Sequence, residues 1–224
     1  MFGVANGIAL QVQSTDDAEH PQLIPLVGQG VKLMSIGFLV DTTAPMIWRG
    51  PMIASAAMQL FRDVAWGELD YLIVDLPPGT GDIQLTIAQQ LSVSGAIIVS
   101  TPQRVALADV IRAKNMFDKV AIPSVGVVEN MSYFICDGCG KQHEIFSRGG
   151  AERAAERFKI PFLGEIPITP SLREWSDKGV PILVREPKSE ISKIFLEIAS
   201  KLAGQLSVVS ESARRAQSLK IISS

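Results

Sequence analysis

The only two cysteines in the sequence lie three residues apart, in the segment Cys136-Asp-Gly-Cys139. Two thiolates at this spacing can share one metal, because the intervening glycine lets the loop fold back on itself. A disulfide scaffold is excluded, since such scaffolds are built from several cysteine pairs. The pair therefore indicates metal or redox chemistry in a reducing compartment, and Cys136 and Cys139 are the candidate metal ligands.

Several kinds of chemistry remain open for this pair. A closed zinc site or a 4Fe–4S cluster needs four ligands, which a two-fold dimer would supply by bringing two pairs together. The alternatives are a redox dithiol, a zinc ion that bridges a dimer, or a site that adds His143. Asp137 and Gly138 are a poor start for the helix that follows a thioredoxin-like pair. His143 is more typical of a surface or packing residue.

A second candidate site follows an apolar run at residues 69–75, which predicts a short buried strand ending in Asp75. A carboxylate at the carboxyl end of a central parallel strand lies where α/β folds bind ligands, and it can hold Mg²⁺ through water. Gly79 and Gly81 follow in the string PPGTGD, and glycines let backbone N–H groups approach a phosphate. The segment favours a nucleotide site; the alternative is that Asp75 only caps a turn.

A phosphate-binding loop of the Walker A type does not occur in this sequence. That loop reads GxxxxGK followed by Ser or Thr, and its lysine neutralises phosphate charge. The only Gly-Lys pair, at Gly140 and Lys141, is followed by Gln142, and Ile135 stands where the first glycine belongs.

These residues must be positioned by an alternation of strands and helices, which predicts a doubly wound, mainly parallel α/β sheet. An irregular segment, residues 130–148, carries both cysteines. We divide the chain into one domain at residues 1–206 and a polar C-terminal tail at residues 207–224. The expected strands are residues 31–40, 71–75, 96–100, 124–129 and 161–166, and the expected helices are residues 51–66, 82–91, 105–120, 149–158, 171–178 and 189–206.

Composition narrows the classes of partner. Hydrophobic residues make up 47% of the 224-residue chain and the net charge is −2, which is the balance of a globular core. The sequence has no basic block, so we expect no nucleic-acid partner. Its apolar runs are far shorter than the roughly 20 residues of a membrane span, so we expect no membrane partner.

Taken together and in order, the motifs resemble the Mrp/ApbC branch of the P-loop ATPases, relatives of MinD and of the nitrogenase iron protein. The resemblance runs from residue 1 to residue 202. Members carry a glycine- and lysine-rich loop and an acidic DAD segment ahead of this region. The resemblance therefore implies a P-loop NTPase fold that is missing its first strand–loop–helix unit. The matching segments are GVKLMSIGFL at 30–39, WRGPM at 48–52, residues 66–84 with PPGTGD, STPQ at 100–103, VENMS at 128–132, the cysteine pair, and LGEIPI at 163–168.

The resemblance also implies roles for single residues. Asp75 matches the catalytic acid associated with Mg²⁺. Gly79, Thr80 and Gly81 match the loop that senses the γ-phosphate. Asn130 matches the residue that reads the adenine edge, and Pro167 lies in the stretch that flanks the base.

The function implied by the resemblance is that of an iron–sulfur cluster scaffold and carrier. A homodimer would hold a 4Fe–4S cluster at Cys136 and Cys139 of both copies and transfer it to apo client proteins, coupled to ATP and Mg²⁺ in the full-length family. Whether this chain is itself an ATPase stays open without the Walker A loop. One alternative is a non-catalytic dimer that binds zinc or a cluster, and another is a MinD/ParA-like partitioning ATPase. We expect a cytoplasmic location, or an organellar matrix or stroma.

Overall fold

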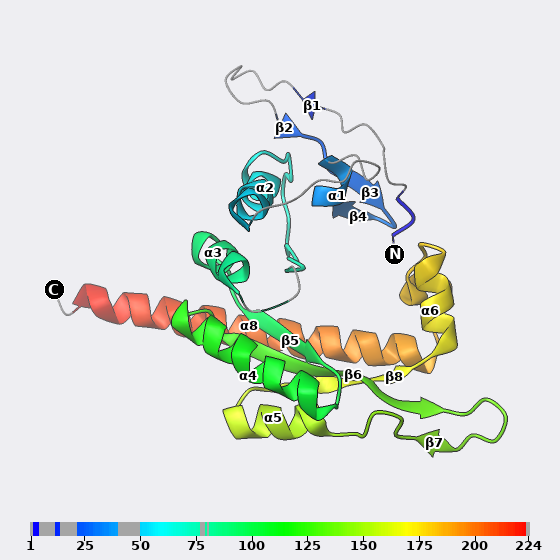
Figure 1. Cartoon of the computed structure of the whole chain (residues 1–224). Coiled ribbons are helices and arrows are strands. Elements are labelled where there is room, and N and C mark those ends of the chain that lie inside the picture. Colours follow the sequence, from blue (N-terminus) through cyan, green and yellow to red (C-terminus); the bar gives the residue numbers. More distant parts are fainter. Residues whose placement is uncertain are drawn as a thin grey trace.

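The computed structural model describes residues 2–4, 12–13, 22–39, 50–76, 79 and 81–222. Thr80, Trp48 and Arg49 lie outside the described residues. Figure 1 shows two parts, a sheet with its helices at residues 82–222 and a smaller N-terminal part above it.

The main sheet is built on one long strand, β6 (Ser124–Ile135). Strands β5 (Ala96–Ser100) and β8 (Phe162–Ile168) flank it, and both run parallel to it. The last residues of β6 leave this parallel arrangement and pair in antiparallel fashion with β7 (Gln142–His143). The sheet is thus parallel at its centre, as predicted, with an antiparallel hairpin at one end.

Helices cover both faces of this sheet. Helices α4 (Arg104–Lys119) and α5 (Gly150–Phe158) pack on one face, where β5 and β6 contribute Ile98 and Val127 to a buried cluster. Helix α8 (Glu190–Ile222) packs on the other face, against Val128 and Leu163. The short helices α6 (Pro170–Asp177) and α7 (Ile182–Arg185) complete that second cluster. This is the doubly wound α/β arrangement that the sequence predicts.

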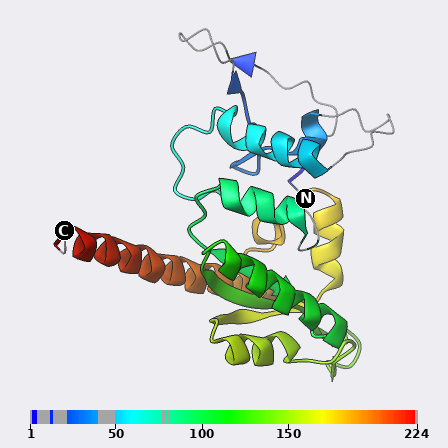
Figure 2. The same cartoon turned by 60° about the vertical axis from the view of Figure 1, so that its left-hand side comes forward.

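Helix α8 is longer than predicted. We expected it to end near Leu206, but it continues to Ile222 and extends beyond the sheet (Figure 2). Residues 207–222 contain neither proline nor glycine, the residues that interrupt helices most strongly. The division into a domain and a tail at residue 207 stays a prediction.

The N-terminal part contains small antiparallel pairs. The hairpin of β3 (Leu26–Gly28) and β4 (Val31–Leu33) turns at Gln29 and Gly30, whose φ angles are +52° and +80°. The predicted strand at residues 31–40 is therefore wrong beyond its first residues, because the chain enters α1 (Ile36–Leu39). The two-residue strands β1 (Val12–Gln13) and β2 (Gln22–Leu23) form the other pair.

The predicted helix at residues 51–66 is present as α2 (Gly50–Arg62), and the predicted helix at residues 82–91 is present as α3 (Asp82–Gln90). The two helices pack against each other through Ala54, Ala57 and Ile87.

The buried strand predicted at residues 71–75 is wrong. These residues are irregular and exposed, and the side chain of Ile73 is 87% exposed. An apolar run becomes a central parallel strand only when other strands pair with its backbone. None of the described strands pairs with residues 71–75. The apolar composition of this run therefore favours a strand, but it does not show whether neighbouring strands pair with it.

One glycine fixes the place where α5 begins. A Cβ atom on Gly150 would lie 2.5 Å from the backbone oxygen of Pro102, in the loop after β5. A side chain at this position would push the start of α5 away from the sheet, because a backbone atom cannot rotate aside.

We expect Gly150→Ala to lower the free energy of unfolding by about 1–3 kcal/mol. Gly204→Ala in α8 is the matched control, since a Cβ there meets nothing within 4 Å. The control should be neutral or should stabilise by up to about 1 kcal/mol through higher helix propensity. Urea unfolding of the wild type and both variants measures these changes. If Gly150→Ala unfolds at the same urea concentration as the wild type, α5 can move away from Pro102 without loss of stability.

Candidate functional site

Both cysteines lie at the tip of the β6–β7 hairpin. Cys136 follows the last residue of β6, and its backbone N–H donates to the Lys141 carbonyl oxygen at 3.0 Å. The Gly140 N–H donates back to the Cys136 carbonyl oxygen at 2.8 Å. Cys136 is half-buried, and Cys139 is exposed. The tip is thus a compact turn that presents two free thiols at the end of a β-ribbon.

The turn favours the thiolate form of Cys136. The backbone N–H of Cys139 lowers the pKa of the Cys136 thiol most, followed by the backbone N–H of Gly138 and the side chain of Cys139. Partial burial and the charge of Asp137 act in the opposite direction, but they are the smaller causes. Because metals bind the thiolate, a lowered pKa prepares this sulfur for ligation.

The hairpin offers the cysteines as the metal ligands. His143, the third residue that we considered, is exposed in β7. Within the described part of the chain, His, Cys, Asp and Glu side chains form no group of three or more that could hold a metal ion.

A buried carboxylate lies where the hairpin joins the sheet. Glu129 in β6 is 0% exposed. Its Oε1 accepts hydrogen bonds from Ser132 Oγ at 2.7 Å and from the Gly149 N–H at 2.8 Å. Its Oε2 accepts from the Ala151 N–H at 2.7 Å. Gly149 is the N-cap residue of α5 and Ala151 lies in its first turn, where N–H groups lack partners within the helix and the helix dipole favours negative charge.

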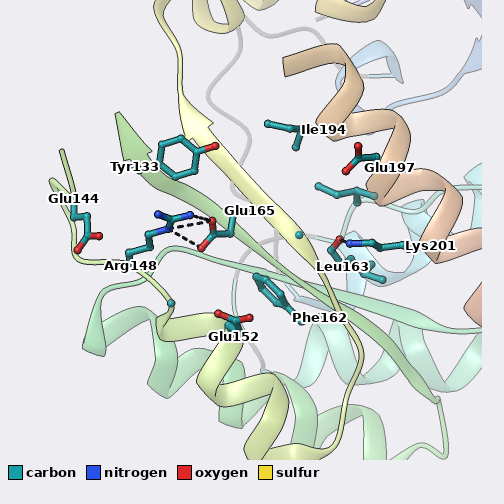
Figure 3. Close-up of a pocket in the computed structure, with 13 residues that line it drawn as sticks. Tyr133, Glu144, Arg148, Glu152, Phe162, Leu163, Glu165, Ile194, Glu197 and Lys201 are labelled. Atoms are coloured by element: carbon teal, nitrogen blue, oxygen red, sulfur yellow. Dashed lines mark hydrogen bonds and ion pairs between the residues drawn. The ribbon is translucent and has the colours of Figure 1, made fainter. Parts of the chain in front are cut away.

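A second carboxylate, Glu165 in β8, lies beside the first. The two residues are register partners on neighbouring parallel strands. Arg148 donates to Glu165 through Nε at 3.0 Å and through Nη2 at 2.6 Å, and these bonds raise the pKa of the guanidinium. The guanidinium also lies 4.8 Å from the ring centre of Tyr133. Figure 3 shows this group beside a cavity of about 600 Å³ that reaches Leu163 and Lys201.

Asn130 lies within β6, where the register of its pairing with β8 shifts, and Pro167 lies near the end of β8. Asn130 is the register partner of Ile166 in β8, so Pro167 comes next to it. Asn130 Oδ1 accepts a hydrogen bond from the Met131 N–H at 2.9 Å. The two predicted residues therefore lie one position out of register on neighbouring strands.

The other predicted nucleotide residues lie in a different segment. Asp75 is exposed and ends the irregular run that leads to Gly79, whose φ is +108°. Gly81 precedes the first residue of α3, and its N–H donates to Gln84 Oε1 at 3.0 Å. These residues lie around the start of a helix, but none of the described strands joins Asp75 to the sheet.

Sequence reasoning missed Glu129 and Arg148. A signal existed for the first, because a glutamate directly after the apolar run of residues 125–128 is a charged side chain at a buried position. Two of its three partners, Gly149 and Ala151, lie 20 and 22 residues further along the chain, and neither spacing nor composition identifies them. No comparable signal marks Arg148, which follows a polar loop.

Comparison with known proteins identifies the family. Residues 1–203 match the family described as ParA: NUBPL iron-transfer P-loop NTPase. The chain is 50% identical over 191 residues to the iron–sulfur cluster transfer protein NUBPL of Dictyostelium discoideum, covering 85% of this chain and 59% of that protein. It is 45% identical over 206 residues to the iron–sulfur cluster carrier protein of Escherichia coli K12, covering 92% of this chain and 54% of that protein.

Two solved structures resemble the fold of this chain. A nucleotide-binding protein from Archaeoglobus fulgidus, in complex with ADP and with cobalt, is 40% identical, with a TM-score of 0.65, over 81% of this chain and 68% of that chain. The cell-division ATPase MinD of Pyrococcus furiosus is 20% identical, with a TM-score of 0.51, over 70% of this chain and 59% of that chain, and shares the fold.

The chain spans somewhat more than half the length of the curated relatives that it matches. The match nevertheless covers nearly the whole of this chain, including the cysteine hairpin and the strands that carry it. The chain therefore belongs to the NUBPL iron-transfer family of ParA-type P-loop NTPases.

Proposed function

We propose that this chain carries an iron–sulfur cluster on Cys136 and Cys139 and transfers it to apo client proteins. The observation that carries the proposal is the hairpin tip, where an exposed thiol lies beside a thiol whose pKa is lowered. Membership of an iron-transfer family supports iron–sulfur chemistry over a redox dithiol. Exposure of the tip suits a carrier, since a cluster that must be released has to be reachable by its recipient.

We further propose that two copies share one 4Fe–4S cluster. A cluster of this type takes four thiolates, and each chain has two cysteines. A two-fold axis beside the hairpin tips would bring the four sulfurs together. The ribbon form of the hairpin supports this, because the β6–β7 hairpin extends to an edge of the molecule (Figure 1) and the cysteines lie between its two strands.

Nucleotide binding is a separable part of the proposal. Asn130 and Pro167 would contact the base, Asp75 would act on Mg²⁺, and residues 79–81 would face the phosphates. The relative from Archaeoglobus fulgidus was solved with ADP, which supports a nucleotide in this family. This sequence has no Walker A lysine, so hydrolysis by this chain alone is not part of the proposal.

The location also stays a prediction. One relative, from Arabidopsis thaliana and 49% identical over 190 residues, is named as a mitochondrial iron–sulfur protein required for NADH dehydrogenase. Others are bacterial. The mitochondrial and the bacterial relatives are both consistent with the reducing cytoplasm or organellar matrix that we expect for a chain with two free thiols.

Anaerobic reconstitution with iron and sulfide tests the carrier proposal. We expect absorption near 400 nm and about four irons per two chains, both lost in Cys136→Ser. His143→Ala is the matched control in the same hairpin, and it should keep its iron because only thiolates are ligands. Loss of iron in the control would indicate a Cys–Cys–His site. Preference of the wild type for zinc over iron would favour the non-catalytic zinc module.

The thiolate can be tested without iron. In Cys139→Ser, Cys136 is the only thiol, and the N–H groups of residues 138 and 139 still face it. A lowered pKa leaves more thiolate at a given pH, so alkylation by iodoacetamide should reach half its maximal rate at a lower pH in the folded chain than in urea. Coincident pH profiles would show that the turn does not stabilise the thiolate.

Calorimetric titration with MgADP tests the nucleotide part. If Asn130 reads the base, Asn130→Ala should weaken binding by about tenfold, the effect of one lost hydrogen bond. Asn115→Ala, at an exposed position of α4, should bind as the wild type does. A wild-type chain that binds no MgADP would remove the nucleotide part and leave the cluster part standing.

A further inference from the structure

The hairpin leaves the sheet at a bulge in β6. Asn130 pairs with Ile166 and Phe134 pairs with Ile168, so β6 advances four residues where β8 advances two. Met131 lies in this bulge with a φ of +56°, a left-handed conformation that is costly for a side chain of its size. Bulges redirect a strand, and they persist where surrounding contacts over-determine them. The direction of the hairpin is therefore set at residues 130–133.

One carboxylate oxygen joins the outgoing strand of the hairpin to the segment that follows its returning strand. Ser132 lies in β6, and Gly149 is the N-cap residue of α5, after β7; both donate to Oε1 of Glu129. Glu129 and Ser132 are each 0% exposed, so water does not compete for these bonds. The Ala151 N–H occupies Oε2, which prevents the carboxylate from turning away.

A second carboxylate, that of Glu165, also binds the segment between β7 and α5, nearer the surface. Arg148 in that segment forms an ion pair with Glu165 and lies over the ring of Tyr133 in β6. Figure 3 shows these three side chains gathered beside the strands. Two carboxylates in register on β6 and β8 thus hold Arg148, Gly149 and Ala151, the residues that end the hairpin segment and begin α5.

We propose that Glu129 is a positioning residue that fixes the direction in which the cysteine hairpin leaves the sheet. Its carboxylate acts through Ser132 and Gly149 and touches neither cysteine. In a dimer that shares one cluster, the sulfurs of both hairpins must lie within bonding distance of its iron atoms. A hairpin whose direction varies would place its sulfurs correctly in only a fraction of the molecules. This consequence rests on the proposed function, whereas the positioning itself does not.

The sharpest test removes the outgoing strand's bond and leaves the cap of α5 intact. Ser132→Ala does this, because the Gly149 and Ala151 donors stay on the carboxylate. Ser192→Ala is the matched control: Ser192 is also 0% exposed and its hydroxyl donates to the Glu186 carbonyl oxygen at 2.7 Å, but it lies in α8. Both variants lose a buried hydroxyl donor, so a general loss of stability affects both.

Hydrogen exchange of the Cys136 and Gly140 amides in the iron-free protein is the readout. We expect exchange at both amides to be about fivefold to tenfold faster in Ser132→Ala, the effect of one lost hydrogen bond, and unchanged in Ser192→Ala. Ser132→Thr keeps the hydroxyl donor and should restore slow exchange. Equal exchange in the Ala variants would overturn the inference.

A second variant covers the case in which Ser132→Ala does not fold. Glu129→Gln replaces one carboxylate oxygen with an N–H₂ group that must face a donor, so it should also speed exchange at the hairpin tip. Unchanged exchange in this variant would likewise overturn the inference. Because no iron is present, these results are independent of whether the wild-type protein assembles a cluster.

Discussion

The cysteine hairpin begins beside a buried carboxylate, that of Glu129. Glu129 is fully enclosed, and three donors compensate for the water that its carboxylate has lost. One of those donors is the N–H of Gly149, the N-cap residue of α5, and another is the N–H of Ala151 in its first turn, so the carboxylate and the helix N-terminus satisfy each other. The third donor is Ser132, which lies in the bulge. Hydrogen bonds to one side chain thus join the start of α5 to the base of the hairpin.

The proposed metal ligands, Cys136 and Cys139, lie at the far end of this hairpin. The tip contributes backbone N–H groups that favour the Cys136 thiolate, while Cys139 stays open to solvent. A rigid ribbon with an exposed end suits a cluster that is held between two copies and later released. Asn130, which we propose contacts the base, directly precedes Met131 in this bulge and accepts a hydrogen bond from its N–H.

Much of this fold is predictable from the sequence, because hydrophobic periodicity reports which faces are buried. The strands at residues 96–100 and 161–166 and the helices at residues 105–120 and 149–158 follow from it, and the cysteine pair is evident from spacing alone. Residues 71–75 show the limit: apolar composition cannot tell whether a pairing strand is present, and the run is exposed. Glu129 shows the other limit, since its role comes from contacts with distant residues. The roles predicted for Asp75, residues 79–81, Asn130 and Pro167 stay predictions.

Native mass spectrometry of the reconstituted protein tests whether two copies share one cluster through four thiolates, as we propose. We expect a species whose mass equals two chains plus one 4Fe–4S cluster, and its disappearance in Cys139→Ser. A cluster carried by a single chain, or a dimer whose added mass is that of zinc, would contradict it.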